Sequence, residues 1–99
     1  FYRGKEDKAL AMMAEGALLE ATYNWSGFSM PSRGLKLEGQ SQHNRLAVLD
    51  FPGPACLVEL GFISNLDDVQ MLVSRAARLA FWEHLAERLT EVKHVAETA

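Results

Sequence analysis

Apolar residues recur at three- and four-residue spacing in two long segments of the chain. In residues 5–23 this spacing predicts an amphipathic helix with one buried face. A second helix is expected over residues 75–92, beginning after Ser74, which can cap it. We expect the buried face of the first helix to hold Leu10, Met13, Ala14, Ala17 and Ala21. We expect that of the second to hold Leu79, Trp82, Ala86 and Leu89, widened by Phe81 and Leu85.

A shorter helix is predicted between these two. Ser64 or Asn65 can cap its start, and Asp67 and Asp68 place negative charge at the positive end of the helix dipole. The segment before the first of these residues is strongly apolar, so we expect a change from strand to helix there.

Two apolar runs too short for helices are predicted to be strands. Residues 46–49 form the first run, and a stretch dense in Pro and Gly separates it from the second, residues 55–60. The second run is continuously apolar rather than alternating, which is typical of a strand covered on both faces. The fold expected is therefore α/β, part of a twisted mixed sheet with helices on both faces.

Glu59 interrupts the second run. Carboxylates are rarely buried without a partner, so this side chain needs an explanation. It would lie at the carboxyl end of a central strand, just before Gly61, where open α/β sheets bind ligands. The alternative is structural: Glu59 forms a salt bridge with Arg33, Arg45 or another cation, or caps a neighbouring helix.

Composition excludes some classes of function. The formal charge of −3 and the isoelectric point near 5.5 supply no basic surface for nucleic acid. No transmembrane segment is expected, because the longest apolar run is far shorter than the ~20 residues a spanning helix needs. Residues 1–4 lack an initiator methionine and a signal-peptide pattern, so any export signal is expected upstream or absent. The single cysteine, Cys56, is expected to pack as a small apolar residue.

The run Pro-Ala-Cys-Leu-Val-Glu-Leu-Gly-Phe-Ile-Ser-Asn at residues 54–65, followed by an acidic pair, resembles a known family. It is similar to the closing signature of the zinc-dependent N-acetylmuramoyl-L-alanine amidases of the amidase-3 type. Residues 32–36 and 43–49 resemble the preceding loop and strand, closest to phage endolysin-like members, and residues 2–23 resemble the helix before them. The resemblance implies that residues 1–92 are the carboxyl-terminal portion of a single amidase domain, with a frayed tail over residues 93–99.

The resemblance also implies a chemistry. Such enzymes hydrolyse the peptidoglycan amide between N-acetylmuramic acid and L-alanine, with Zn²⁺ held by two histidines and a glutamate. A further glutamate, at the position of Glu59, works beside the metal as general base, because zinc lowers the pKa of bound water to about 7. The metal ligands are expected upstream of Phe1 or in another chain, and this chain is assigned none. The implied partners are peptidoglycan and a complementary amino-terminal segment, and the implied location is the bacterial cell wall, reached as a periplasmic, secreted or phage protein.

Histidines and arginines supply the other candidate residues. His43 either contacts substrate or orders Glu59, or it is a loop histidine that holds a backbone carbonyl. Arg33 and Arg45 either receive peptide carboxylates or brace the loop. His84 and His94 are expected on solvated helix surfaces, about 280° apart around a helix, so a replacement metal site is not expected.

A non-catalytic function remains open beside the enzyme. In that alternative the chain is a remnant that binds cell-wall fragments or a partner protein through an exposed sheet edge. Replacement of Glu59 distinguishes the two, because only the enzyme depends on its carboxylate for turnover.

Overall fold

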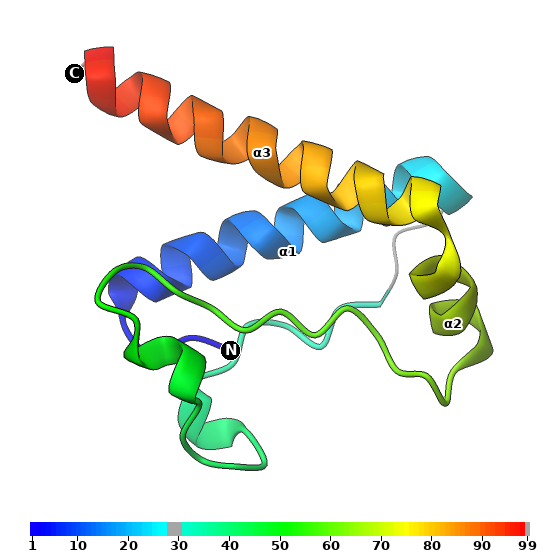
Figure 1. Ribbon diagram of the computed structural model, residues 1–99, viewed down its shortest axis with the longest axis horizontal. Helices are drawn as coiled ribbons and strands as arrows, with labels where there is room; N and C mark the ends of the chain where they lie inside the picture. Colours follow the sequence, from blue (N-terminus) through cyan, green and yellow to red (C-terminus); the bar gives the residue numbers. More distant parts are fainter. Residues whose placement is uncertain (28–30, 99) are drawn as a thin grey trace. The chain divides into compact units, whose positions relative to one another are not determined.

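The protein is described by a computed structural model that covers residues 1–27 and 31–98, with side chains described to residue 91 (Figure 1). The α-helices are α1 (Lys5–Ser26), α2 (Leu66–Val73) and α3 (Arg75–Thr98). Two short 3-10 helices, η1 (Glu38–Gln40) and η2 (Ala47–Asp50), lie between α1 and α2 in the chain. The part of the chain that the structure describes contains no strand, only one isolated bridge between Tyr2 and Leu37. The predicted mixed sheet with helices on both faces is therefore wrong.

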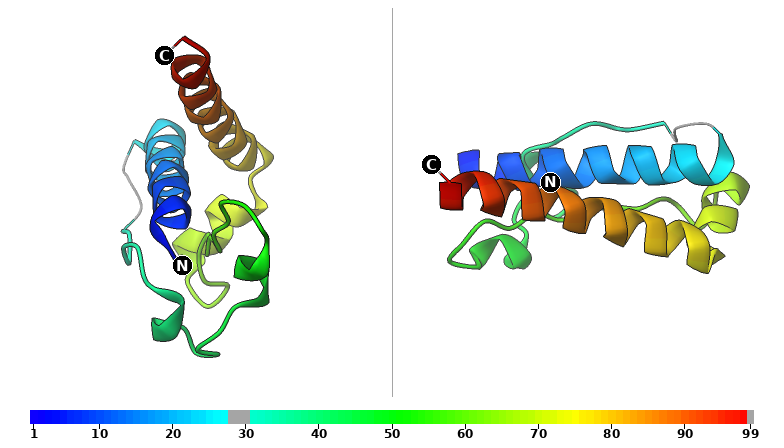
Figure 2. Two further views of the ribbon diagram at one scale, coloured as in Figure 1. Left: turned by 90° about the vertical axis from the view of Figure 1, so that its left-hand side faces the viewer. Right: turned by 90° about the horizontal axis from the view of Figure 1, so that it is seen from above.

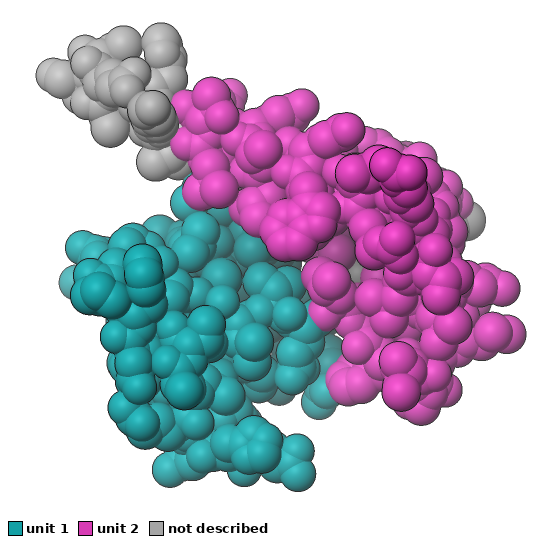
Figure 3. Space-filling view, viewed as in Figure 1, with its two compact units in different colours: residues 1–15, 32–59 teal, residues 16–31, 60–99 magenta. Residues whose placement is uncertain are grey.

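The chain divides into two compact units, which Figure 3 shows in different colours. Unit 1 comprises residues 1–15 and 32–59, and unit 2 comprises residues 16–31 and 60–99. The single long helix α1 contributes its first half to unit 1 and its second half to unit 2. Within the described residues, no helix is long and apolar enough to cross a membrane.

The first predicted strand is replaced by η2 because side chains take its backbone hydrogen bonds. Arg3 donates to the carbonyl oxygen of Leu49 (2.8 Å) and, more weakly, to that of Leu46 (3.5 Å), while Glu38 accepts the N–H of Leu46 (3.1 Å). The turn is closed locally by the bond from Leu49 N–H to the Leu46 carbonyl (3.0 Å). Side chains that bond nearby backbone groups compete with a strand ladder, and here they replace it.

The second predicted strand is extended but has almost no strand partner. Phe1 and Leu57 exchange both backbone hydrogen bonds, at 2.8 and 3.1 Å, in the pattern of an antiparallel pair. The next residue of the N-terminal segment, Tyr2, forms the parallel bridge with Leu37. A single residue pair on each side does not make a sheet, since stable sheets need several paired residues in three or more strands.

The predicted face of α1 is confirmed where the residues are small. Of the predicted residues, Ala14 is buried in unit 1, and Ala17 and Ala21 are buried in unit 2. Ala11, which was not predicted, is also buried in unit 1. Their three- and four-residue spacing places all four on one side of the helix. Alanine is the best helix former, so the same residues favour the helix locally and allow close packing against it.

Helix α2 begins as the sequence predicts. Asn65 is its N-cap, and the Asn65 Oδ1 atom accepts the backbone N–H of Asp68 (3.0 Å). Asp68 in turn accepts the N–H of Phe62 (2.9 Å), which closes the turn that leads into the helix. Gly61 makes this turn possible, because a Cβ atom there would lie 3.1 Å from the Asp68 Cβ atom.

Helix α3 buries a different face from the one predicted. Ser74 caps it by accepting the N–H of Ala77 (3.2 Å), as expected. Phe81, which was predicted to widen the stripe, is buried, and so is Ala77, whereas the stripe residues Leu79, Trp82 and Leu89 remain 46%, 58% and 42% exposed. The predicted stripe is wrong because the face of α3 that packs on residues 16–26 of α1 carries polar residues after Phe81. There His84 and Arg88 pair with Glu20.

Candidate functional site

Glu59 lies at the end of the extended segment of unit 1, with its side chain exposed. The expectation that Glu59 lies inside a strand buried on both faces is wrong, because the described residues form no sheet that could bury it. Ala55 is buried and residues 56–58 are half-buried, so burial decreases along the segment toward Glu59. No hydrogen bond or ion pair with a described residue holds the Glu59 carboxylate, so the structural alternative of a salt bridge to arginine is not seen in this part of the chain.

Asp7 anchors the segment that carries Glu59. The Asp7 Oδ1 atom accepts the backbone N–H of Ala55 (2.9 Å), and Oδ2 accepts those of Arg3 (3.3 Å) and Gly4 (3.4 Å). These bonds stabilise the ionised carboxylate, and the Ala55 N–H is the largest cause of a lowered Asp7 pKa. The sequence shows Asp7 as an acidic residue in the first turn of α1, and nothing in it indicates a bond to Ala55.

The other candidates lie in unit 1 without converging on Glu59. His43 is exposed in a turn, where its carbonyl oxygen accepts the Arg45 N–H (2.6 Å). Arg45 pairs with Asp50 (2.7 Å), which is the bracing arrangement rather than a free cation. Arg33 is exposed in the segment after the undescribed residues. Substrate binding by His43, Arg33 and Arg45 stays a prediction.

Arg3 organises the loop that carries Arg45, a role that the sequence does not predict. Its guanidinium contacts both oxygens of Glu38 (2.5 and 3.1 Å) and one of Asp50 (3.0 Å). The hydrogen bond with Glu38 is the main reason that the Arg3 pKa is raised and the Glu38 pKa is lowered. Arg3 is a single cation remote in sequence from its partners, so no local pattern could have identified this role.

Cys56 is half-buried in the extended segment of unit 1. Burial is the main cause of a raised pKa for its thiol. A thiol with a raised pKa is protonated near neutral pH and is a poor nucleophile, in keeping with a packing role.

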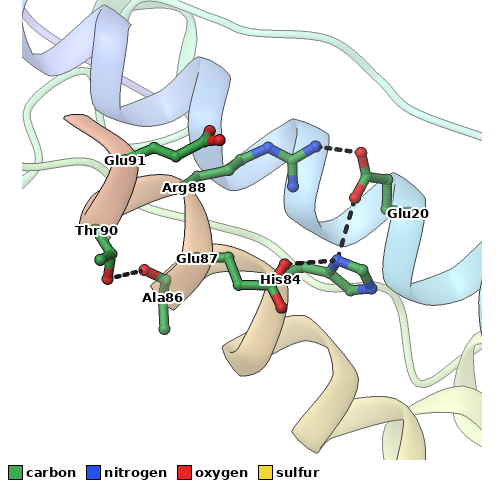
Figure 4. Close-up of a pocket in the computed structure, with 7 residues that line it drawn as sticks. All are labelled: Glu20, His84, Ala86, Glu87, Arg88, Thr90 and Glu91. Carbon is green, nitrogen blue, oxygen red and sulfur yellow. Dashed lines mark hydrogen bonds and ion pairs between the residues drawn. The ribbon is translucent and has the colours of Figure 1, made fainter. Parts of the chain in front are cut away.

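Unit 2 contains an open hollow of about 610 Å³ between α3 and the second half of α1 (Figure 4). Glu20 lines the hollow from α1, with one carboxylate oxygen on Arg88 (2.6 Å) and the other on the Nδ1 atom of His84 (3.1 Å). Gly16 contacts Arg88, and Asn24 contacts His84, so the two helices run in opposite directions here, as the right-hand view in Figure 2 also shows. The hollow is lined by Glu20, His84, Ala86, Glu87, Arg88, Thr90 and Glu91.

His84 is therefore not on a solvated helix surface, and that expectation is wrong. Only 22% of its side chain is exposed, and both ring nitrogens have partners. When Nδ1 donates to Glu20, the Nε2 atom accepts from the Asn24 amide at 3.0 Å, which defines a neutral tautomer. The only sequence signal for this cluster is that His84 and Arg88 are four residues apart, which places them on one face of a helix. The sequence does not show which acidic residue of another helix they meet.

Gly16 allows Arg88 to approach α1 closely. A Cβ atom at this position would lie 3.2 Å from Arg88 Nη2 and 3.3 Å from Cζ. The Arg88 Nη1 atom is buried and has no hydrogen-bond partner among the described residues. The cluster thus has the geometry of an interhelical lock, in which one carboxylate holds a guanidinium and an imidazole.

None of these residues fits a catalytic zinc site. No group of three or more His, Cys, Asp or Glu side chains in the described part of the chain is arranged to hold a metal ion. His94 lies outside the residues whose side chains the structure describes. Comparison with models of protein families, with curated proteins and with solved structures finds no match for the chain.

Proposed function

We propose that this chain is the carboxyl-terminal part of a peptidoglycan amidase in which Glu59 acts as the general base. One observation carries the proposal: the Glu59 carboxylate stands exposed, without a partner among the described residues, at the end of a segment held at Ala55 and Leu57. The twelve-residue signature around it adds the family resemblance described above. A carboxylate that is presented rather than paired is available to accept a proton from an attacking water.

The anchoring of this segment suits that role. Asp7 fixes the backbone four residues before Glu59, and Phe1 fixes it two residues before. After Glu59, Gly61 and the Asp68 side chain hold the turn that begins α2. General bases act within hydrogen-bond reach of the proton they remove, so a backbone fixed before the base limits its positions.

In this proposal the zinc ligands lie outside these 99 residues. The substrate is the amide between N-acetylmuramic acid and L-alanine of the stem peptide, and the site of action is the bacterial cell wall. The test uses the intact gene product that contains this chain, purified with its metal content measured and then incubated with peptidoglycan. Mass spectrometry should detect stem peptides with a free L-alanine amino group, together with intact lactyl-bearing sugar chains. Cleavage at another bond, or no cleavage by a zinc-free protein, would contradict the proposal.

The proposed partner segment has a separate test. The 99-residue chain alone and the same chain mixed with the amino-terminal segment of the gene product are melted while circular dichroism is recorded. We expect a higher melting temperature and a more cooperative transition in the mixture, because the extended residues 55–60 gain backbone partners. An unchanged melt, together with binding of wall fragments that is insensitive to Glu59→Gln, would favour the non-catalytic alternative.

A further inference from the structure

Helix α3 of unit 2 carries an apolar stripe on its exposed side. Leu79, Trp82, Ala86 and Leu89 follow one another at spacings of three, four and three residues, and all four are exposed. This is the a/d pattern of a heptad repeat, which places the four side chains along one seam of the helix. Buried Ala77 and Phe81 lie on the other side, so the helix has one apolar face inside the unit and another outside it.

The outer stripe has a fixed anchor. The ring of Trp82 lies 4.9 Å from the ring of Phe81, centroid to centroid, with the planes inclined by 57°. Phe81 is buried, so this contact holds the indole of Trp82 in place while leaving it 58% exposed. A preorganised exposed aromatic residue in an apolar stripe is typical of an interaction surface, since ordering it on binding costs little further entropy.

We propose that the α3 stripe, defined as Leu79, Trp82, Ala86 and Leu89, pairs with the same stripe of a second copy of the chain, parallel and in register. The charged residues beside the stripe favour a second copy of the chain as the partner, and they favour the parallel orientation. Arg78 and Glu83 flank the stripe at the g and e positions and are exposed. In a parallel pair, the g residue of one helix meets the e residue of the next heptad on its partner. Arg78 of each copy therefore faces Glu83 of the other, and the two-fold symmetry makes this attraction twice.

The antiparallel alternative is disfavoured by the same residues. Centred on this stripe, it would place Glu83 of one copy beside Glu83 of the other, and like charges across a pair of helices are destabilising. Two heptads make a small interface, so the dimer is weak and depends on concentration.

The test uses two single variants and their mixture. Arg78→Glu and Glu83→Arg each replace both attractive pairs with repulsive ones, and each should weaken self-association roughly tenfold or more. An equimolar mixture of the two variants restores both attractions in the mixed dimer. Sedimentation velocity over a range of concentrations should therefore show dimers for the wild type and the mixture, and monomers for either variant alone.

The mixture also separates charge from folding. Arg78 donates to the carbonyl oxygen of Leu72 (2.8 Å), so Arg78→Glu removes a bond at the end of α2 as well as a charge. Mixing does not restore that bond, so recovery of the dimer in the mixture reports the intermolecular pair alone. Trp82→Ser should abolish the dimer, whereas Val73→Ser, at an exposed apolar residue of α2 outside the stripe, should leave it unchanged.

Three results would overturn the proposal. A wild-type chain that stays monomeric at every concentration would mean that no second copy covers the stripe. A dimer that survives Arg78→Glu would exclude the parallel register, and a dimer that survives Trp82→Ser would exclude the stripe itself. No peptidoglycan enters the assay, so its outcome is independent of the proposed hydrolase.

Discussion

At the scale of single residues, the chain places carboxylates in three different roles. Asp7 accepts backbone N–H groups, Glu20 joins two cationic or donor side chains of α3, and Glu59 has no partner among the described residues. The sequence singles out only Glu59, because an acidic residue inside an apolar run is visible without any structure. Asp7 and Glu20 lie on the helix α1, and their partners are 48 and 68 positions away in the chain, so no local pattern indicates these bonds.

Asp7 predicts how stability depends on acid. Its pKa is lowered in the folded chain, so it contributes stability that is fully present above the pKa of an unfolded aspartate, about 4, and is lost as the pH falls through the lower folded value. We expect the free energy of unfolding, measured with urea from pH 7 to pH 3, to fall less steeply at its acid end in Asp7→Asn. Glu6→Gln, in the same helical turn, accepts none of these N–H bonds and should keep the wild-type slope. Equal slopes for Asp7→Asn and the wild type would contradict this role.

At the scale of elements, short-range signals were reliable and long-range ones were not. The starts of α2 and α3 depend on side chains within three residues, and Asn65 and Ser74 cap them as predicted. The strand prediction for residues 46–49 failed because two side chains bind that backbone: Arg3, which is 46 positions from Leu49, and Glu38, which is eight positions from Leu46. A strand also needs neighbouring strands, which its own residues do not specify. The apolar content of residues 55–60 therefore could not show whether they join a sheet.

The cap of α2 gives a direct test of the local signal. The sequence left Ser64 and Asn65 as alternatives, and the structure selects Asn65. Asn65→Ala should therefore destabilise α2 by about 1 kcal/mol, because the Asp68 N–H loses its acceptor. Hydrogen exchange at the Asp68 amide should accelerate in Asn65→Ala and stay unchanged in Ser64→Ala. If exchange became faster in Ser64→Ala and not in Asn65→Ala, the cap would be Ser64, and this prediction would be contradicted.

The lock between α1 and α3 predicts a coupling between Gly16 and Arg88. Replacing a glycine in a helix interior by alanine normally stabilises the helix by about 1 kcal/mol. Here the new Cβ atom would press on the Arg88 guanidinium, which Glu20 holds, so the gain in Gly16→Ala should be reduced or lost. In an Arg88→Ala background the obstacle is gone and the full gain should return. Urea denaturation of the four proteins measures this cycle, and identical effects in both backgrounds would exclude the contact.

At the scale of the whole molecule, the described chain is mostly helical, with extended segments that find little pairing. The helices could be predicted because their hydrogen bonds are local, whereas a sheet depends on several segments at once. Of the candidate site, the sequence located Glu59 and the turn after it, but not the anchors that hold its segment or the ion pairs around Arg3 and Glu20. Those contacts join residues without a shared pattern, so they required coordinates.

The central claim, that Glu59 serves as a general base, is tested most directly by one rate. The intact gene product, its Glu59→Gln variant and a Glu6→Gln control are compared at saturating peptidoglycan, with newly formed L-alanine amino groups counted over time. Glu59→Gln should lower kcat by about 10²–10⁴-fold at an unchanged melting temperature, since the amide cannot accept the proton, while Glu6→Gln should match the wild type. Wild-type turnover in Glu59→Gln would contradict the account.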